Sequence, residues 1–350
     1  MASSLKIGSI YGIEIRVHIS LILILLLLSY IFYISPFPYG FAGVEFAAFL
    51  SVISSISLFV AVLLHELAHS ILSLRSGINV KGIILFIFGG ISLIEDIPKE
   101  PEKEMKIAFA GPLTSLILGF GTILISQALP TPLYEFFYVF GRINIFLAVF
   151  NLIPAFPLDG GRILRAFMSR SMGFVKATRV AAETGKFMAI LFGIVGLLYN
   201  PWLILIALFI YMGANEEEKL AVVENILRKI KISEIMTPNP IFVTPETNLE
   251  EVKDLMFRFR HLGYPVVKNG EVVGIVTLHD VVKGGERVAD VMSREIVSIS
   301  PDDDAYKAFR LMNQHNIGRI PVVKEGQLVG IVSRTDLIRV LEILEVLSGE

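Results

Sequence analysis

The most constraining feature of the sequence is a series of long apolar runs separated by short polar segments. A helix needs about 20 mostly apolar residues to cross a hydrocarbon core roughly 30 Å thick. A hydrophobic fraction of 54% is well above that of an ordinary globular protein. Much of the chain therefore lies in lipid, and we predict a polytopic α-helical membrane protein. We expect about six spans, at residues 18–35, 45–74, 106–128, 135–153, 178–199 and 202–219.

Lysine and arginine are concentrated in alternate loops. Segments 75–106 and 154–186 are rich in them, whereas 36–44, 129–134 and 199–202 contain none. Cytoplasmic loops collect these residues, so the pattern predicts a multi-pass protein of the cell membrane with both termini and the polar C-terminal region in the cytoplasm. The net charge is -2 and no basic stretch is long, which argues against a nucleic-acid partner.

Two histidines and a glutamate occupy a stretch of five consecutive residues inside the second apolar run, in the motif HELAH. A charged group at bilayer depth costs about 2.5 to 3.5 kcal/mol, so an ionisable cluster there indicates function. His65 and His69 are four residues apart and lie on one helix face, with Glu66 beside them. Zinc held by two histidines and a carboxylate keeps a position open for water, whose proton a glutamate can take. The chain has no cysteine, so further ligands come from histidine and carboxylate.

Asp159 is the candidate for the third ligand. It follows an apolar run and precedes Gly160 and Gly161, which permit a turn and a close backbone approach. An aspartate there can fold back towards a metal ion. The alternative is that Asp159 is the N-cap of the helix that follows it.

These two motifs together resemble those of the site-2 protease family of intramembrane zinc metalloproteases. HELAH is similar to the family's metal-binding motif, and NLIPAFPLDGG to its Asn-Pro-Asp-Gly motif. The resemblance implies one zinc ion per chain, bound by His65, His69 and Asp159. It implies that Glu66 is the general base and that Asn151 contacts the substrate backbone or the transition state. It also implies a transmembrane protein as substrate, cleaved in or near a membrane-spanning segment within the lipid bilayer.

Two further segments resemble parts of the same family. In residues 109–119 (FAGPLTSLILG), Thr114 and Ser115 stand where many relatives carry an asparagine, and we expect this segment to serve helix packing only. Residues 82–97 are too short to span a bilayer and are interrupted by two glycines, so we expect a hairpin. This hairpin resembles the family's small membrane-associated sheet, which can accept an unwound substrate segment as an added strand. The N-terminal 20 residues alternate polar and apolar residues and predict one or two strands.

The C-terminal region contains an internal repeat. Met236 pairs with Met292 and Gly274 with Gly330, each at an offset of 56 positions. The repeats resemble a tandem pair of cystathionine-β-synthase-type (CBS) modules, a soluble α/β domain. We expect four parts: a membrane-embedded zinc metalloprotease domain (1–215), a linker helix (216–231) and the two CBS repeats (232–283 and 288–343).

Each CBS repeat retains a hydroxyl and an aspartate at matching positions. These are Thr277 and Asp280 in the first repeat, and Ser333 and Asp336 in the second. The resemblance implies that an adenine nucleotide binds there, with the hydroxyl near phosphate and the aspartate on ribose, and that the pair regulates the protease. The alternative is a structural role or a dimerising role, in which the pair forms a homodimer.

A second function class also fits these features. A CBS-gated divalent-metal transporter or channel would use the same histidines and aspartate to bind the transported ion. Such a protein has no evident use for Glu66 beside its ligands. The sequence therefore favours zinc-dependent intramembrane proteolysis over transport.

Overall fold

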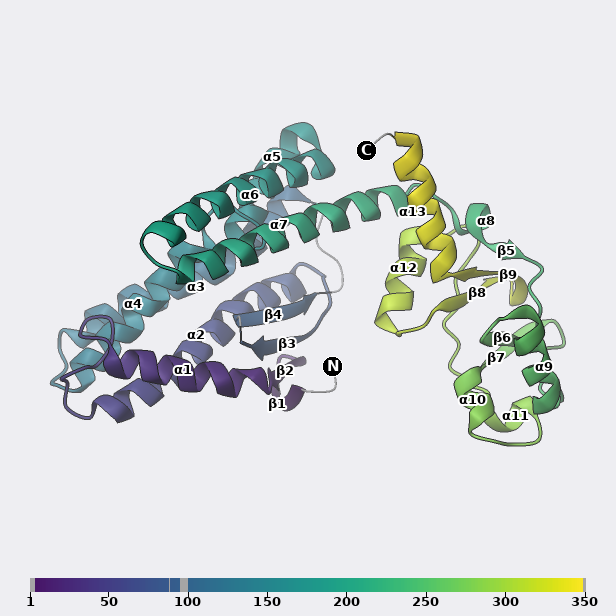
Figure 1. Cartoon of the computed structure of the whole chain (residues 1–350), viewed down its shortest axis with the longest axis horizontal. Coiled ribbons are helices and arrows are strands. Elements are labelled where there is room, and N and C mark those ends of the chain that lie inside the picture. Colours follow the sequence, from purple (N-terminus) through teal and green to yellow (C-terminus); the bar gives the residue numbers. More distant parts are fainter. Residues whose placement is uncertain (1–3, 88, 95–99, 349–350) are drawn as a thin grey trace. The chain divides into compact units, whose positions relative to one another are not determined.

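The computed structural model describes residues 4–87, 89–94 and 100–348. The chain divides into two compact units, residues 1–219 and 220–350 (Figure 1). The first is mainly helical and contains a small sheet, and the second is a mixed α/β unit.

Long helices dominate the first unit. Four of the described helices, α2, α3, α4 and α6, are long and apolar enough to cross a membrane. This confirms the predicted helical membrane protein, whereas the number of six spans stays a prediction. The helices are α1 (Ser20–Ile34), α2 (Ala47–Arg75), α3 (Pro101–Ser126), α4 (Leu133–Asn151), α5 (Asp159–Met172), α6 (Phe174–Leu198) and α7 (Trp202–Leu227).

The first and last predicted spans differ from the other four. Helix α1 has 15 residues, which is short for a span. Helix α7 starts in the last apolar run and continues without a break through the acidic residues Glu216 to Glu218 as far as Leu227. The predicted boundary at residue 216 is therefore not a helix end, and the last apolar run and most of the predicted linker form one helix.

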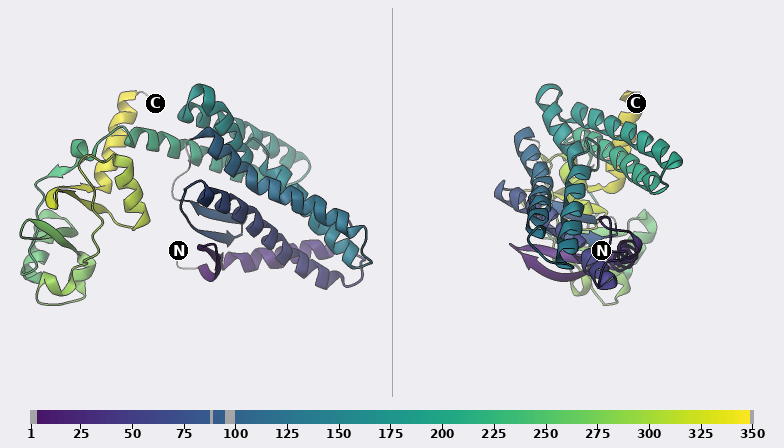
Figure 2. Two further views of the ribbon diagram at one scale, coloured as in Figure 1. Left: turned by 180° about the vertical axis from the view of Figure 1, so that it is seen from behind. Right: turned by 90° about the vertical axis from the view of Figure 1, so that its left-hand side faces the viewer.

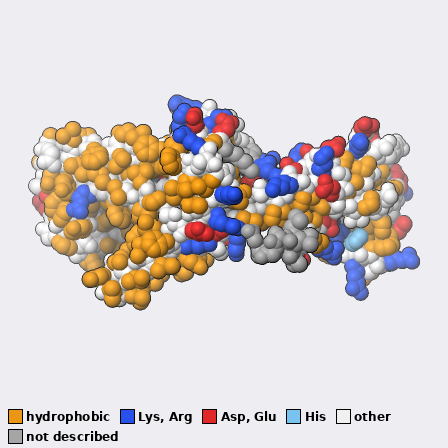
Figure 3. Space-filling view, turned by 90° about the horizontal axis from the view of Figure 1, so that it is seen from above, with side chains coloured by type: hydrophobic (Ala, Val, Ile, Leu, Met, Phe, Trp, Pro, Cys, Tyr) orange, Lys and Arg blue, Asp and Glu red, His pale blue; other side chains and the backbone are white. Residues whose placement is uncertain are grey.

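The helices of the first unit pack side by side with an apolar exterior. Helix α2 contacts α1 on one side and α3 on the other, and α3 packs along α4 (Figure 2). Hydrophobic side chains cover much of the visible face of this unit, and charged side chains gather at one end of it and on the second unit (Figure 3). Exposed apolar surface on this scale is the expected exterior of a protein whose solvent is lipid.

A four-stranded sheet lies against α2. Its strands, in spatial order, are β1 (Ser4–Ile10), β2 (Ile13–His18), β3 (Val80–Phe86) and β4 (Gly89–Ile94). This confirms the predicted N-terminal strands and the hairpin, although residues 88 and 95–97 of that hairpin lie outside the described residues. The parallel pairing of β2 with β3, which joins the N-terminus to the hairpin, was not predicted. Strand β4 is at one edge of the sheet.

A buried ion cluster fixes α5 to its neighbours. Arg165 is 1% exposed, and its Nε donates to Glu104 Oε1 of α3 at 2.7 Å. Its Nη1 donates to Glu217 Oε2 of α7 at 3.2 Å. An arginine taken out of water is stable only when its hydrogen bonds are made, so this cluster ties three helices together. It lies less than two turns from Asp159, the first residue of α5.

The second unit contains the two repeats. One five-stranded sheet has the order β5-β9-β7-β6, with β8 paired to β9. The first repeat consists of α8 (Ile232–Ile235), β5 (Thr237–Pro238), α9 (Leu249–Phe259), β6 (Gly263–Lys268), β7 (Glu271–Thr277) and α10 (Leu278–Val282). The second consists of α11 (Val288–Val291), α12 (Ala305–Gln314), β8 (Arg319–Lys324), β9 (Gln327–Ser333) and α13 (Arg334–Ser348).

The repeated landmarks are the points where the two modules interlock. Strand β5 of the first repeat pairs with β9 of the second, and Ser293 at the start of the second bridges to Ile275 of β7. A Cβ at Gly274 would lie 2.9 Å from the sulfur of Met292. A Cβ at Gly330 would lie 2.6 Å from the sulfur of Met236. Each repeat therefore supplies a methionine that packs on a glycine of the other.

Candidate metal centre

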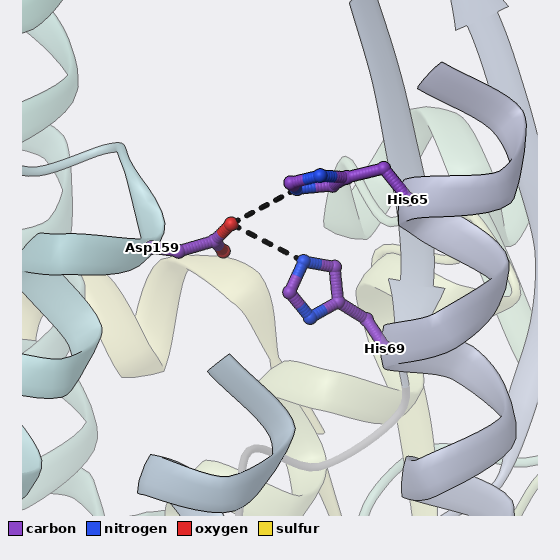
Figure 4. A group of neighbouring side chains, drawn as sticks. All are labelled: His65, His69 and Asp159. Atoms are coloured by element: carbon purple, nitrogen blue, oxygen red, sulfur yellow. Dashed lines mark hydrogen bonds and ion pairs between the residues drawn. The ribbon is translucent and has the colours of Figure 1, made fainter. Parts of the chain in front are cut away.

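Three ionisable side chains meet in the interior of the first unit. His65 and His69 project from one face of α2, and Asp159 faces them from the start of α5 (Figure 4). Asp159 Oδ2 lies 3.1 Å from His65 Nε2 and 3.2 Å from His69 Nε2. All three side chains are buried. The i, i+4 spacing brings the two rings together, and the turn before α5 brings the carboxylate to them.

Contacts on the far side of each ring set its orientation. His69 Nδ1 lies 2.6 Å from the carbonyl oxygen of Ile107, and a carbonyl only accepts, so Nδ1 carries the proton and donates it. The lone pair of His69 Nε2 then points at the Asp159 carboxylate. His65 Nδ1 lies 2.9 Å from Ser115 Oγ, which holds that ring in the matching direction. Partners of this kind orient metal-ligating histidines in proteins.

The donor set fits a zinc ion. At His69, whose Nδ1 carries the proton, the Nε2 lone pair and the Asp159 carboxylate repel each other in this buried site unless a proton or a metal cation lies between them. Around tetrahedral zinc, with bonds of about 2.0 to 2.2 Å, ligand atoms lie roughly 3.3 Å apart. The two nitrogen–oxygen distances of 3.1 and 3.2 Å match this spacing. In the described part of the chain, His65, His69 and Asp159 form the one group whose ligand atoms converge in this way, within 4.8 Å.

Gly111 of α3 leaves room for the centre. A Cβ at this position would lie 2.6 Å from His65 Nε2 and closer still to His69 Nε2. Any side chain here would occupy the space between the ligand atoms. Gly111 and Pro112 of α3 thus form one wall of the site, and the close approach of the α3 backbone to the two histidines requires glycine at position 111.

Glu66 lies beside the cluster and is not part of it. Its carboxylate is half-buried and accepts a hydrogen bond from Ser92 Oγ of β4, at 2.7 Å to Oε2. Glu66 lines the same cavity as His65, His69 and Asp159. A carboxylate in this place, not used as a ligand, can accept a proton from a water that enters the cavity.

The cavity is large and mostly apolar. Its volume is about 970 Å³. Helices α1, α2, α4 and α7 and the edge strand β4 all contribute to its wall, including Leu28, Ile143 and Phe150. A cavity of this size accommodates an extended peptide segment next to the metal ligands.

The structure settles several expectations about single residues. The N-cap of α5 is Leu158, and Asp159 is its first helical residue, so the alternative role of Asp159 as N-cap is wrong. The expectation that the Thr114–Ser115 segment only packs helices is also wrong, because Ser115 contacts His65. Asn151 is the last residue of α4 and lines the cavity, and its Nδ2 donates to the carbonyl oxygen of Leu147 at 2.9 Å. Its role towards substrate stays a prediction.

The residues that orient the site were not predicted from the sequence. Ser115, the Ile107 carbonyl and Ser92 were not singled out for function, and neither was Gly111. The spacing of Ser115 four residues after Gly111 on α3 is the only sequence signal that places both on the face turned to α2.

In the second unit, the hydroxyl and aspartate of each repeat contact each other. Thr277 Oγ1 donates to Asp280 Oδ2 at 2.6 Å, and Ser333 Oγ donates to Asp336 Oδ2, also at 2.6 Å. A cavity of about 440 Å³ lies within this unit, and its lining includes Thr277 but none of Asp280, Ser333 and Asp336.

Two cations, Arg260 and Arg319, also line this second cavity. Burial by itself raises the pKa of Asp280, but hydrogen bonds from Thr277 and Lys283 outweigh it and lower the pKa below its usual value. Asp280 is therefore an ionised acceptor next to a cavity with a positively charged lining.

Comparison with known proteins gives matches over both units. The model of peptidase family M50 matches residues 53–131 and 122–192, and that of the CBS domain matches 232–286 and 288–343. The chain is similar to a zinc metalloprotease of Methanocaldococcus jannaschii, with 40% identity over 99% of this chain and 98% of the relative.

Two solved structures are also similar. A site-2 protease from Methanocaldococcus jannaschii has 38% identity over 61% of this chain and 95% of that chain, with a TM-score of 0.47. A crystal structure of CBSX2 in complex with AMP has 23% identity over 33% of this chain and 98% of that chain, with a TM-score of 0.32.

Proposed function

Because the chain belongs to peptidase family M50, as a zinc metalloprotease of the site-2 type with tandem CBS domains, we propose that it hydrolyses a peptide bond in or near a transmembrane segment of another protein. The observation that carries the proposal is the convergence of His65, His69 and Asp159 beside Glu66, in a cavity walled by apolar helices. One zinc ion per chain fits this donor set.

The substrate must be unwound before it reacts. A helix hides its carbonyl groups in its own hydrogen bonds, so a membrane-spanning substrate exposes a peptide bond only where its helix is broken. Strand β4 is an edge strand whose residues Gly90, Ile91 and Ser92 line the cavity. An extended substrate segment that adds to this edge satisfies its backbone groups and lies next to the metal ligands. Substrates with glycine or other helix-weakening residues near the cleaved bond are expected.

The chemistry divides between the metal ion and the protein side chains. A bound zinc ion acts as a Lewis acid that polarises the scissile carbonyl and lowers the pKa of the attacking water. Glu66 takes the proton of that water and passes it to the leaving nitrogen. Ser115 and the Ile107 carbonyl hold the two histidines in their ligating orientation. We propose that Asn151, which lines the cavity at the end of α4, contacts the substrate backbone.

Cleavage and transport can be measured on one sample. We would reconstitute the protein with zinc and a synthetic transmembrane peptide of about 25 residues that is interrupted by Gly-Gly. Peptide fragments are followed by mass spectrometry, and divalent-ion flux by an indicator trapped in the vesicles. We expect zinc-dependent cleavage without flux. Flux without cleavage would support the CBS-gated transporter or channel instead.

The membrane orientation follows from the distribution of basic residues, and we propose that both termini and the CBS pair are cytoplasmic. The native chain has no cysteine, so single cysteines report accessibility cleanly. In intact cells, a membrane-impermeant maleimide should label Glu45→Cys but not Glu102→Cys. Both positions are solvent-exposed. Glu45 lies just before α2, on the predicted outer side, and Glu102 lies at the start of α3, on the predicted cytoplasmic side. After lysis both should react. Labelling of Glu102→Cys in intact cells would overturn the orientation.

For the second unit, we propose that an adenine nucleotide, ATP or AMP, binds the cavity lined by Thr277 and changes the rate of cleavage. Arg260 and Arg319 in the lining suit phosphate, and the Thr277 hydroxyl is a further polar group for the nucleotide. Asp280 does not line the cavity itself, so we propose that it acts on the nucleotide through Thr277, which donates to its carboxylate. A ligand regulates only by its difference in affinity between two states of the protein. If no nucleotide binds, the pair serves instead as a structural or homodimer module.

Calorimetry on the full-length protein tests this proposal. We expect Thr277→Ala to weaken nucleotide binding roughly tenfold or more, because it removes a hydroxyl that lines the cavity. Ser333→Ala is the matched control: it removes the equivalent internal hydrogen bond of the second repeat, but Ser333 does not line this cavity. Equal losses from both variants, or no heat with either nucleotide, would contradict the proposal.

A further inference from the structure

We infer that strand β4 positions the catalytic base, through a hydrogen bond from Ser92 and a close contact at Gly90. The inference rests on the proposed function, since it concerns the same site. It adds Ser92 as a positioning residue, which acts on the reaction only through Glu66.

The contact between β4 and the base involves two residues of one strand face. Side chains two apart in a strand point to the same side, so positions 90 and 92 both face α2. Ser92 Oγ donates to Glu66 Oε2 at 2.7 Å. At Gly90, an added Cβ would lie 2.6 Å from Glu66 Cγ and 3.3 Å from Glu66 Cδ. The strand therefore hydrogen-bonds the carboxylate of the base at Ser92 and lies close to its Cγ at Gly90, where a side chain would displace Glu66.

A second serine backs this contact. Ser70 is fully buried on α2, one turn after Glu66, and its Oγ lies 3.1 Å from Ser92 Oγ. Because the Ser92 hydroxyl gives its proton to Glu66, it accepts from Ser70. The hydroxyl of Ser92 thus accepts a hydrogen bond from Ser70 and donates one to Glu66, which favours one position of the Glu66 carboxylate.

This arrangement connects substrate binding with the orientation of the base. Strand β4 is an edge strand that lines the active-site cavity. A peptide that pairs with β4 is therefore bound by the same strand that contacts the Glu66 side chain. Pairing fixes an edge strand that otherwise has one unpaired side. The base is then oriented by the element that receives the substrate. Fixing a proton acceptor within a small angle of its productive direction raises the rate of the chemical step.

The test compares Ser92→Ala, Ser92→Thr and Gly90→Ala, using the synthetic Gly-Gly-interrupted transmembrane peptide in vesicles. We expect Ser92→Ala to lower kcat roughly 10- to 100-fold with KM and zinc content unchanged, because a hydrogen bond to a charged group is lost. Ser92→Thr keeps the hydroxyl and should restore most of the rate. Gly90→Ala displaces the Glu66 side chain and should also lower kcat without loss of zinc.

Two controls separate this effect from general damage. Ser51→Ala removes a buried hydroxyl of the same helix α2 that bonds only to its own backbone, and should leave kcat unchanged. Gly121→Ala adds a methyl group where nothing lies within 4 Å, and should also be neutral. If Ser92→Ala does not fold, the Thr and Gly90 variants still carry the test.

Three results would overturn the inference: an unchanged kcat in Ser92→Ala, a rise in KM alone, or a Ser92→Thr protein as slow as Ser92→Ala. In each case a wild-type protein that cleaves the peptide leaves the proposed function intact. If the wild-type protein is itself no faster than Glu66→Gln, the proposed function fails, and with it the inference.

Discussion

Glu66→Gln protein is expected to keep one zinc ion per chain and to lose peptide cleavage about a hundred- to ten-thousand-fold. The reason is geometric: Glu66 is outside the group of converging ligand atoms and accepts instead from Ser92. Glutamine has nearly the same shape but cannot take a proton from water. Metal analysis and single-turnover cleavage of the reconstituted peptide, measured on the same preparation, check both halves of this expectation.

The matched control for this substitution is Glu102→Gln, which removes an exposed carboxylate at the start of α3. It should alter neither zinc content nor rate. A Glu66→Gln protein that lacks zinc would make Glu66 a ligand, and one that cleaves at the wild-type rate would remove it from the mechanism.

Asp159→Ala should lose both zinc and activity. Without its carboxylate, the two imidazole nitrogens are the only remaining protein ligands of the described group, and two ligands do not hold a catalytic zinc ion. Loss even of an outer-shell partner typically weakens metal binding about 10- to 100-fold, so loss of a ligand should exceed that. Competition with a chromophoric chelator gives the change in affinity.

The same centre can be disrupted without a change in any ligand. In Gly111→Ala, the added methyl group occupies the space between the histidine nitrogens, so zinc should again be lost. Gly121→Ala, on the same helix and facing open space, is the control and should bind zinc normally. An active Asp159→Ala protein, or a Gly111→Ala protein with normal zinc content, would contradict the ligand assignment.

Much of the architecture follows from local patterns. The lengths of the apolar runs predict the long helices, because a helix of given length and composition is stable in lipid whatever its neighbours are. The repeat offset predicts two equivalent modules in the second unit. The predicted boundary between the last span and the linker helix, at residue 216, does not coincide with a helix end, because α7 continues through it. The acidic run Glu216 to Glu218 changes composition without ending a helix, because glutamate is a good helix former.

The sequence by itself determined the helical membrane protein, the repeated modules and the pairing of His65 with His69. Each of these depends on spacing along one element, which fixes direction on a helix face or a strand. Only the tertiary structure decided what surrounds the ligands. The Asp159 contact with His65 joins residues 94 apart, the Ser115 contact 50 apart and the Ile107 contact 38 apart. Ser92 reaches Glu66 from 26 residues away, on a strand edge. Such contacts depend on the depth and rotation of packed elements, which arise from the sum of all their side chains, and no local pattern encodes them.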